Sequence, residues 1–166
     1  MAWGRASRDG APASLTTAAE VRAQAVAYLA RREHSTRELR TKLVRRCPSA
    51  DMVDDVLAEL VAIDLLSDER TAHGVARVKG ARMGAMGVER ELRARGIEGE
   101  LASGVLADLR TTEVARAQEI WSRKFGEPAI DAAGRARQMR FLQSRGFGSD
   151  AIRAVVPPCP RPASRR

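Results

Sequence analysis

A recurrence of about 50 residues constrains the fold of this chain more than any other feature of its sequence. Leu43, Leu92 and Leu142 are separated by 49 and 50 residues, and an arginine follows each of them three positions later. The same offsets align Ser35, Gly84 and Gly134, then Arg46, Arg95 and Arg145, then Val53, Ala102 and Ile152, and then Val56, Val105 and Val155. A match at so many offsets predicts that one structural unit occurs three times in tandem.

The spacing of apolar residues indicates the nature of that unit. They recur every three or four positions through residues 18–156, as in amphipathic helices, and no segment alternates as a strand does. We therefore predict an all-α fold of nine helices, grouped into three three-helix repeats over residues 18–66, 67–110 and 111–156. Repeats of this size are expected to stack into an elongated, curved array. Residues 1–17 are predicted to be a flexible tail and residues 157–166 a basic, Pro-rich tail.

Local signals place individual helices and their buried faces. Ser35 with Glu38 three residues later predicts a capping box at a helix start. The third repeat matches less well, since polar Gln138 aligns with Leu39 and Val88, and Met139 is expected to supply that contact. Further apolar stripes are predicted at Val53, Val56, Leu57, Leu60 and Ile63, at Val75 and Val78, and at Val114, Ala117, Trp121 and Phe125.

The charge balance points to a negatively charged partner. The 166 residues include 29 Lys and Arg against 21 Asp and Glu, which gives a formal net charge of +8. Lys occurs only at positions 42, 79 and 124, so nearly all the cations are arginines, whose planar donors suit phosphates and carboxylates. This balance favours a polyanion, or a protein bound to one, over the simpler explanation of solubility alone.

The sequence shows no constellation typical of an enzyme, a metal site or a cofactor site. His34 and His73 lack a partner at ligand spacing, and Cys47 and Cys159 form no CxxC pair. The glycines of residues 80–87 resemble a phosphate loop only loosely, and we interpret them as a turn between two helices. We predict a protein that is not an enzyme and that holds no metal and no cofactor. Its cysteines fit a reducing cytoplasm, and no apolar run predicts a membrane span.

Three segments of the chain resemble the RecX family. They are AYLARREHSTRELRTKL from Ala27, LLSDERTAHGVARVKGARMGAMGVERELRARGI from Leu65, and FLQSRGFGSDAI from Phe141. The resemblance covers residues 20–156 and rests on the order and spacing of these motifs. Two features depart from the family pattern: Thr71 stands where an aromatic residue is more usual, and Gly87 lies inside the predicted fifth helix.

The resemblance implies a function. RecX-like proteins restrain RecA, the recombinase that polymerises on single-stranded DNA, by binding along the filament groove and blocking its extension or promoting its loss. Strand exchange, ATP turnover and repressor cleavage then fall, which modulates recombination, DNA repair and the SOS response. The implied partners are the RecA filament and single- or double-stranded DNA, with no membrane, and the implied form is a cytoplasmic monomer. One alternative stays open: a sequence-specific, helix-turn-helix-like DNA-binding regulator.

Basic residues cluster once in each predicted repeat, and we predict that they form one strip that binds acidic filament residues or phosphates. Ordinary solvated helix faces are the alternative. Arg46, Arg95 and Arg145 are not included in this strip, because each is expected near the C-terminus of a helix. A cation there interacts favourably with the helix dipole, which is a structural role. The predicted binding residues are Arg31, Arg32, Arg37, Arg40, Arg45, Lys79, Arg82, Arg90, Arg93, Arg135, Arg137 and Arg140.

Overall fold

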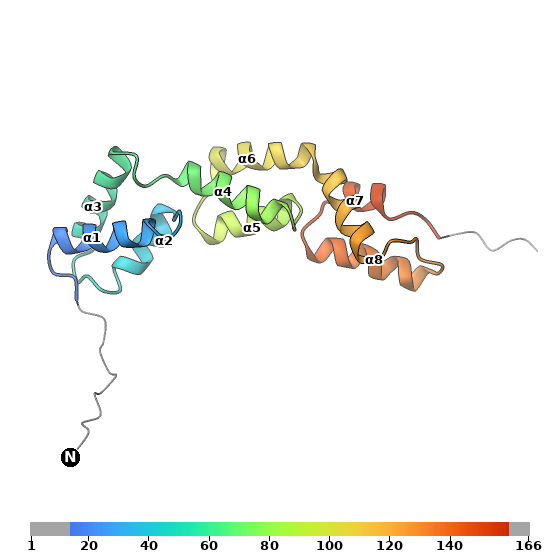
Figure 1. Cartoon of the computed structure of the whole chain (residues 1–166), viewed down its shortest axis with the longest axis horizontal. Coiled ribbons are helices and arrows are strands. Elements are labelled where there is room, and N and C mark those ends of the chain that lie inside the picture. The colour runs from blue at the N-terminus through green and yellow to red at the C-terminus, as the bar shows by residue number, and fades with distance from the viewer. Residues whose placement is uncertain (1–13, 160–166) are drawn as a thin grey trace, which may run out of the picture. The chain divides into compact units, whose positions relative to one another are not determined.

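The structure, a computed structural model, describes residues 14–159 and confirms an all-α helical repeat fold (Figure 1). No strand occurs between residues 14 and 159. The helices are α1 (Ala18–Leu29), α2 (Thr36–Leu43), α3 (Ala50–Ala62), α4 (Asp68–Gly80), α5 (Ala85–Ala94), α6 (Gly99–Thr111), α7 (Glu113–Lys124), α8 (Ala132–Ser144) and α9 (Ser149–Val155). Most of the predicted N-terminal tail, residues 1–13, and residues 160–166 of the predicted C-terminal tail lie outside the described residues.

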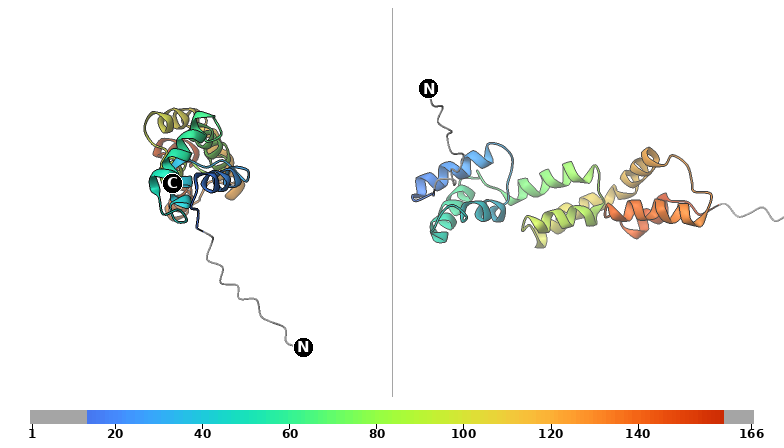
Figure 2. Two further views of the ribbon diagram at one scale, coloured as in Figure 1. Left: turned by 90° about the vertical axis from the view of Figure 1, so that its left-hand side faces the viewer. Right: turned by 90° about the horizontal axis from the view of Figure 1, so that it is seen from below.

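The chain forms two compact units, one ending at Asp68 and the other beginning at Glu69. In the first unit α1, α2 and α3 pack pairwise around one apolar cluster, coloured blue to green in Figure 2. Leu15 joins this cluster although it precedes the first helix, and its N–H donates to the carbonyl of Arg46 at 2.7 Å. The first unit therefore includes at least one core residue that precedes α1.

The second unit contains two apolar clusters. The first lies among α4, α5 and α6, and the second among α7, α8 and α9. Only Thr112 separates α6 from α7, and these two helices also pack against each other. Leu43, Leu92 and Leu142 each have no exposed surface, one in each of the three clusters, so the recurrence in the sequence marks equivalent buried positions. The stacked, curved array and the three repeat boundaries stay predictions.

Three predicted core residues are exposed. Ile63 is 63% exposed because α3 ends at Ala62, one residue before it. Val78 is 62% exposed because the buried face of α4 runs through Ala72, Val75 and Ala76, away from it. Val114 lies in the first turn of α7 and is also exposed.

The weaker match of the third repeat has a structural reason. Gln138 takes the aligned core position and is buried, with both ends of its amide satisfied. Its Oε1 accepts from Trp121 Nε1 at 3.1 Å, and its Nε2 donates to the carbonyl of Glu127 at 2.9 Å. A buried polar group that is fully hydrogen-bonded costs little, so this position tolerates a glutamine. Met139 packs against the same cluster, as predicted.

The helices form three three-helix groups, α1–α3, α4–α6 and α7–α9, each around its own apolar cluster. The second and third groups are joined through backbone atoms. The N–H of Gly84 donates to the carbonyl of Arg145 at 3.0 Å, and the N–H of Met86 donates to that of Gly146 at 3.1 Å. A Cβ on Gly84 would lie 2.4 Å from the carbonyl oxygen of Gly146, and one on Gly87 would lie 2.6 Å from that of Arg145. Gly87 is thus required inside α5 because another backbone approaches it, and the turn after α4 docks onto the third group.

Two side chains of α7 complete this junction. Glu113 accepts from the N–H of Ala85, the first residue of α5, at 2.7 Å, where the helix dipole favours an anion. Arg116 donates to the carbonyls of Gly80 and Met83, both at 2.6 Å, and to that of Leu109 at 2.8 Å. One guanidinium therefore fixes the end of α4, the following turn and the end of α6 to α7.

Candidate basic binding surface

The predicted cations of the first group divide into neutralised and free residues. Arg32 pairs with Glu38 at 3.1 Å, and Arg40 forms a two-pronged pair with Asp54 at 2.7 and 2.9 Å. The hydrogen bonds from Arg40 lower the pKa of Asp54, and those same bonds raise the pKa of Arg40. Exposed Arg31, Arg37 and Arg45 have no ion pair with any carboxylate of residues 14–159.

The second group shows the same division. Lys79 lies 3.5 Å from Glu91, and Arg93 pairs with Glu89 at 2.9 Å one helical turn away. Such exposed pairs contribute at most about 1 kcal/mol and leave a cation available to a stronger anionic partner. Arg82 and Arg90 are exposed, and neither has an ion pair within the described chain.

In the third group one predicted binding residue has a structural role. Arg135 donates to the carbonyl of Pro157 at 2.9 Å and thereby holds the segment after α9 against α8. Arg137 and Arg140 are exposed on α8, and no ion pair neutralises them within residues 14–159. A single strip along all three groups stays a prediction.

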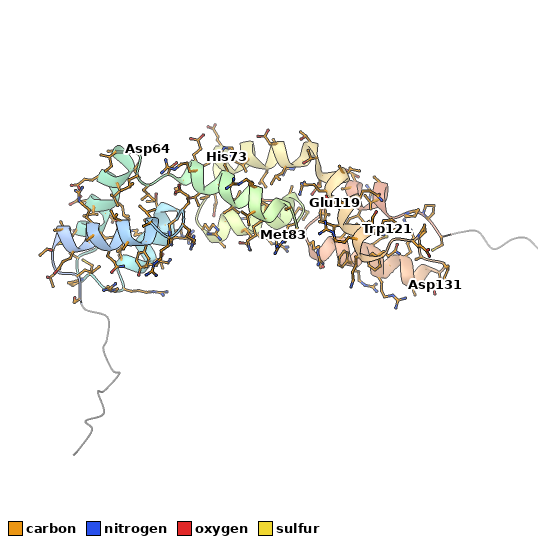
Figure 3. The ribbon with its side chains drawn as sticks, viewed as in Figure 1. Asp64, His73, Met83, Glu119, Trp121 and Asp131 are labelled. Carbon is orange, nitrogen blue, oxygen red and sulfur yellow. The ribbon has the colours of Figure 1, made fainter. Side chains whose placement is uncertain are left out.

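The structure brings Arg82 together with three cations that lie outside the predicted binding residues. Arg82, Arg123, Lys124 and Arg145 line one open groove of about 420 Å³ in the second unit. Arg82 comes from the turn that contains Met83, and Arg123 lies one helical turn after Glu119, both labelled in Figure 3. Sequence spacing gave no signal for this cluster, because the docking of the α4–α5 turn onto the third group creates it.

Arg116 has a further role that its position in the sequence does not reveal. Burial lowers the pKa of its guanidinium. The guanidinium donates to three backbone carbonyls, and its central carbon lies 6.0 Å from the centroid of the Phe147 ring. It is therefore a structural cation that positions Arg82, and it contributes little to the external basic surface.

His34 is buried in a way that leaves it no free nitrogen. Its Nδ1 lies 3.0 Å from the carbonyl of Arg32, and its Nε2 lies 2.7 Å from Nζ of Lys42. Burial lowers the pKa of His34, so the ring is neutral: its Nε2 accepts a hydrogen bond from the Lys42 ammonium, and its Nδ1–H donates to the carbonyl of Arg32. Within residues 14–159 no group of three or more His, Cys, Asp or Glu side chains is arranged to hold a metal ion.

Acidic residues that open α4 and α7 also have a role that the sequence did not reveal. Asp68 Oδ1 accepts from the N–H of Thr36, the first residue of α2, at 2.7 Å. Glu113 does the same for Ala85, the first residue of α5. The same device thus serves the second helix of the first and of the second group.

Comparisons with known proteins agree with this architecture. Two family models match the chain: RecX, first three-helix domain, over residues 22–60, and RecX, third three-helix domain, over residues 111–156. The chain is 40% identical to the regulatory protein RecX of Herminiimonas arsenicoxydans over 136 residues, which cover 82% of this chain and 90% of the relative. It is likewise 40% identical to the RecX of Leptothrix cholodnii over 136 residues, covering 82% and 87% of the two chains.

The fold is also found among solved structures. The crystal structure of RecX from Lactobacillus salivarius superposes with a TM-score of 0.67 at 19% identity, covering 83% of this chain and 93% of that one. No helix between residues 14 and 159 is long and apolar enough to cross a lipid bilayer. Two matched domains and relatives at this identity over most of their length establish that the chain belongs to the RecX family of regulatory proteins.

Proposed function

We propose that this protein binds RecA recombinase filaments on DNA in the cytoplasm and inhibits their strand exchange, ATP turnover and repressor cleavage. Membership of a family of regulatory proteins is the observation that carries the proposal. The exposed, unpaired arginines of α2, α5 and α8 support it, because they offer free guanidinium groups to filament carboxylates or DNA phosphates. The protein is proposed to act as a monomer and without catalysis of its own, so alone it should hydrolyse neither ATP nor DNA.

The test is a titration of the protein into strand-exchange and ATPase assays of the cognate recombinase. We expect inhibition that weakens as salt rises, since each neutralised phosphate makes a separate contribution to the salt dependence. An absence of inhibition, together with preferential binding to one duplex sequence, would instead establish the alternative of a sequence-specific DNA-binding regulator.

Two matched triple variants locate the surface. Arg37, Arg90 and Arg140 are free, so their replacement by Gln should reduce inhibition by about tenfold or more and flatten the salt dependence. The control replaces Arg22, Arg77 and Arg153 by Gln, which removes the same charge from exposed arginines outside the predicted binding residues. Equal inhibition by the two variants would show that the free arginines are not the binding surface.

A further inference from the structure

The groove of the second unit has an unusual charge balance. Its polar lining consists of Arg82, Arg123, Lys124 and Arg145, and its apolar lining consists of Ala81, Ile120 and Phe141. Only Arg123 forms an ion pair, with Glu119 at 2.6 Å. Three cations therefore converge on one groove with no carboxylate of the described residues to neutralise them, an arrangement that is stabilised when an anion enters.

Comparison of the aligned positions in the second and third groups shows why the charge of Arg145 is unpaired. Arg95 and Arg145 are aligned, and each follows the end of its helix. Arg95 lies 3.7 Å from Glu91, the residue four positions before it. The corresponding residue of the third group is Phe141, and the guanidinium of Arg145 stacks on its ring, 3.9 Å from the centroid. The replacement of a carboxylate by an aromatic ring leaves the charge of Arg145 unpaired and holds its plane against a flat surface.

The hydrogen-bonding character of the lining restricts the class of ligand. Arginine and lysine side chains are donors only, and Ala81, Ile120 and Phe141 offer neither side-chain donors nor acceptors. An acidic peptide could place carboxylates against these donors, but its acidic side chains have no aromatic face to match the Phe141–Arg145 stack. A phosphodiester oxygen is purely an acceptor, and a nucleobase has a flat face that stacks on a guanidinium or an aromatic ring.

The dimensions and fixation of the groove fit such a ligand. A volume of about 420 Å³ lies within the range of small-ligand sites, about 300–1,000 Å³. Arg116 anchors the carbonyls of Gly80 and Met83 on either side of Arg82, so the backbone that presents this cation is held in place before a ligand arrives.

We infer that this groove binds a nucleotide of single-stranded nucleic acid, with its base against the Phe141–Arg145 stack and its phosphates between Arg82, Lys124 and Arg145. This rests on the proposed function, in which DNA is a partner, and deepens it by assigning single-stranded nucleic acid to one site of the second unit. Single-stranded substrate is specified because a base within a duplex is already stacked and paired.

The test measures binding of a fluorescent oligo-dT to the full-length protein by anisotropy at several salt concentrations. Replacement of Arg82, Lys124 and Arg145 by Gln should weaken binding by about tenfold or more and reduce the salt slope by about two, given about 0.7 per phosphate contact on single strands. The control variant replaces Arg77, Arg110 and Arg153, which lie outside the groove lining, by Gln at the same net charge. Equal affinity of the two variants would overturn the inference, whatever either does to recombinase inhibition.

A second variant tests the stack separately from the charge. Arg145→Lys keeps the cation and loses the plane, so oligo-dT should bind about fivefold or more weaker while a duplex of the same length is affected less. Thermal melts followed by circular dichroism confirm that the variants are folded. Displacement of oligo-dT by poly-glutamate, combined with an unchanged affinity of Arg145→Lys, would show that the groove is a site for acidic peptide and would refute the inference.

Discussion

The N-termini of α2 and α5 occupy the same position in the first and the second three-helix group, yet they are completed differently. Ser35 caps α2 with its own side chain, which accepts from the N–H of Glu38 at 3.1 Å. Gly84 has no side chain to offer at the start of α5, and its backbone lies against Arg145 and Gly146. The first N–H of each helix is bound by a carboxylate, from Asp68 and Glu113 respectively.

This difference shows what a glycine encodes at an aligned position. Ser35 stabilises its own group and has room for its side chain, whereas Gly84 gives up a local cap so that the backbone of the third group can approach. The second group therefore depends on the third for its junction, through the hydrogen bonds that Gly84 and Met86 donate to it. The third group does not repeat this arrangement at α8, the equivalent helix. The N-cap of α8 is Asp131, whose side chain accepts from the N–H of Gly134 at 2.6 Å.

The largest expected effect tests whether aligned core positions are equivalent. Leu92→Ala should lower the free energy of unfolding by about 2–5 kcal/mol, because Leu92 is fully buried among α4, α5 and α6. The measurement is urea unfolding followed by circular dichroism. Met86→Ala, on the same helix but 57% exposed, is the control and should change stability by no more than about 0.5 kcal/mol. Equal losses in the two variants would mean that the buried face of α5 is wrongly placed.

The next prediction transfers the cap of α2 to α5. Gly84→Ser should destabilise the second unit by about 1–3 kcal/mol, because the new Cβ would meet backbone atoms of Gly146 and Phe147 at 2.4 Å. The control is Gly104→Ser, since a Cβ at Gly104 meets nothing within 4 Å, and a change within about 0.5 kcal/mol is expected. A stabilised Gly84→Ser protein would rule out the backbone junction.

The reverse exchange, a glycine in place of the serine that caps α2, should lower the free energy of unfolding only slightly. Ser35→Gly is expected to cost only a few tenths of a kcal/mol, whereas Ser35→Ala should cost about 1 kcal/mol, because alanine provides neither the cap nor the preferred backbone. Both values come from the same urea titrations. If Ser35→Gly proved as costly as Gly84→Ser, the two positions would not differ in the way described above.

The smallest effect is a pH dependence in the first unit. Burial lowers the pKa of His34 from the usual histidine value of about 6.5. As the pH falls toward and below that value, His34 binds a proton in the unfolded chain but stays neutral in the folded chain, and this favours unfolding. Stability should therefore decline between pH 7.5 and pH 5.5, above the range in which carboxylates titrate. His34→Gln should remove this part of the decline, and an unchanged slope in that variant would contradict the prediction.

The helices were predictable from the sequence because apolar spacing and capping act over a few residues. Leu43, Leu92 and Leu142 have the burial that their alignment predicts, and the capping box of Ser35 is present. Gly134 aligns with the N-caps Ser35 and Gly84, yet α8 already begins at Ala132, because its cap is Asp131, which lies outside the alignment. Ile63 and Val78 were wrongly assigned to the core, since apolar type alone does not tell where a helix ends or which face it buries.

The candidate site was less predictable. Basic residues can be counted in a sequence, but their pairing depends on neighbours distant along the chain, as with Arg40 and Asp54. Arg116 and Arg135 are bound to backbone carbonyls, which no side-chain pattern reveals. The groove around Phe141 arises from a turn of one group docking on another, so only the tertiary structure brings its cations together.

The glycine junction also sets a rule for lengthening the chain by duplication. One half of the junction is a glycine at the start of the second helix of a group, Gly84, and the other is the Arg145–Gly146 pair of the group that follows. The second group contains both halves, because Gly96 follows Arg95 and has a φ of 75°, close to the 76° of Gly146. The first group has Ser35 and Cys47 at these positions. We expect a tandem copy of residues 67–110 to be accommodated between the second and third groups. A copy of residues 18–66 inserted there should instead leave the junction unformed on both sides.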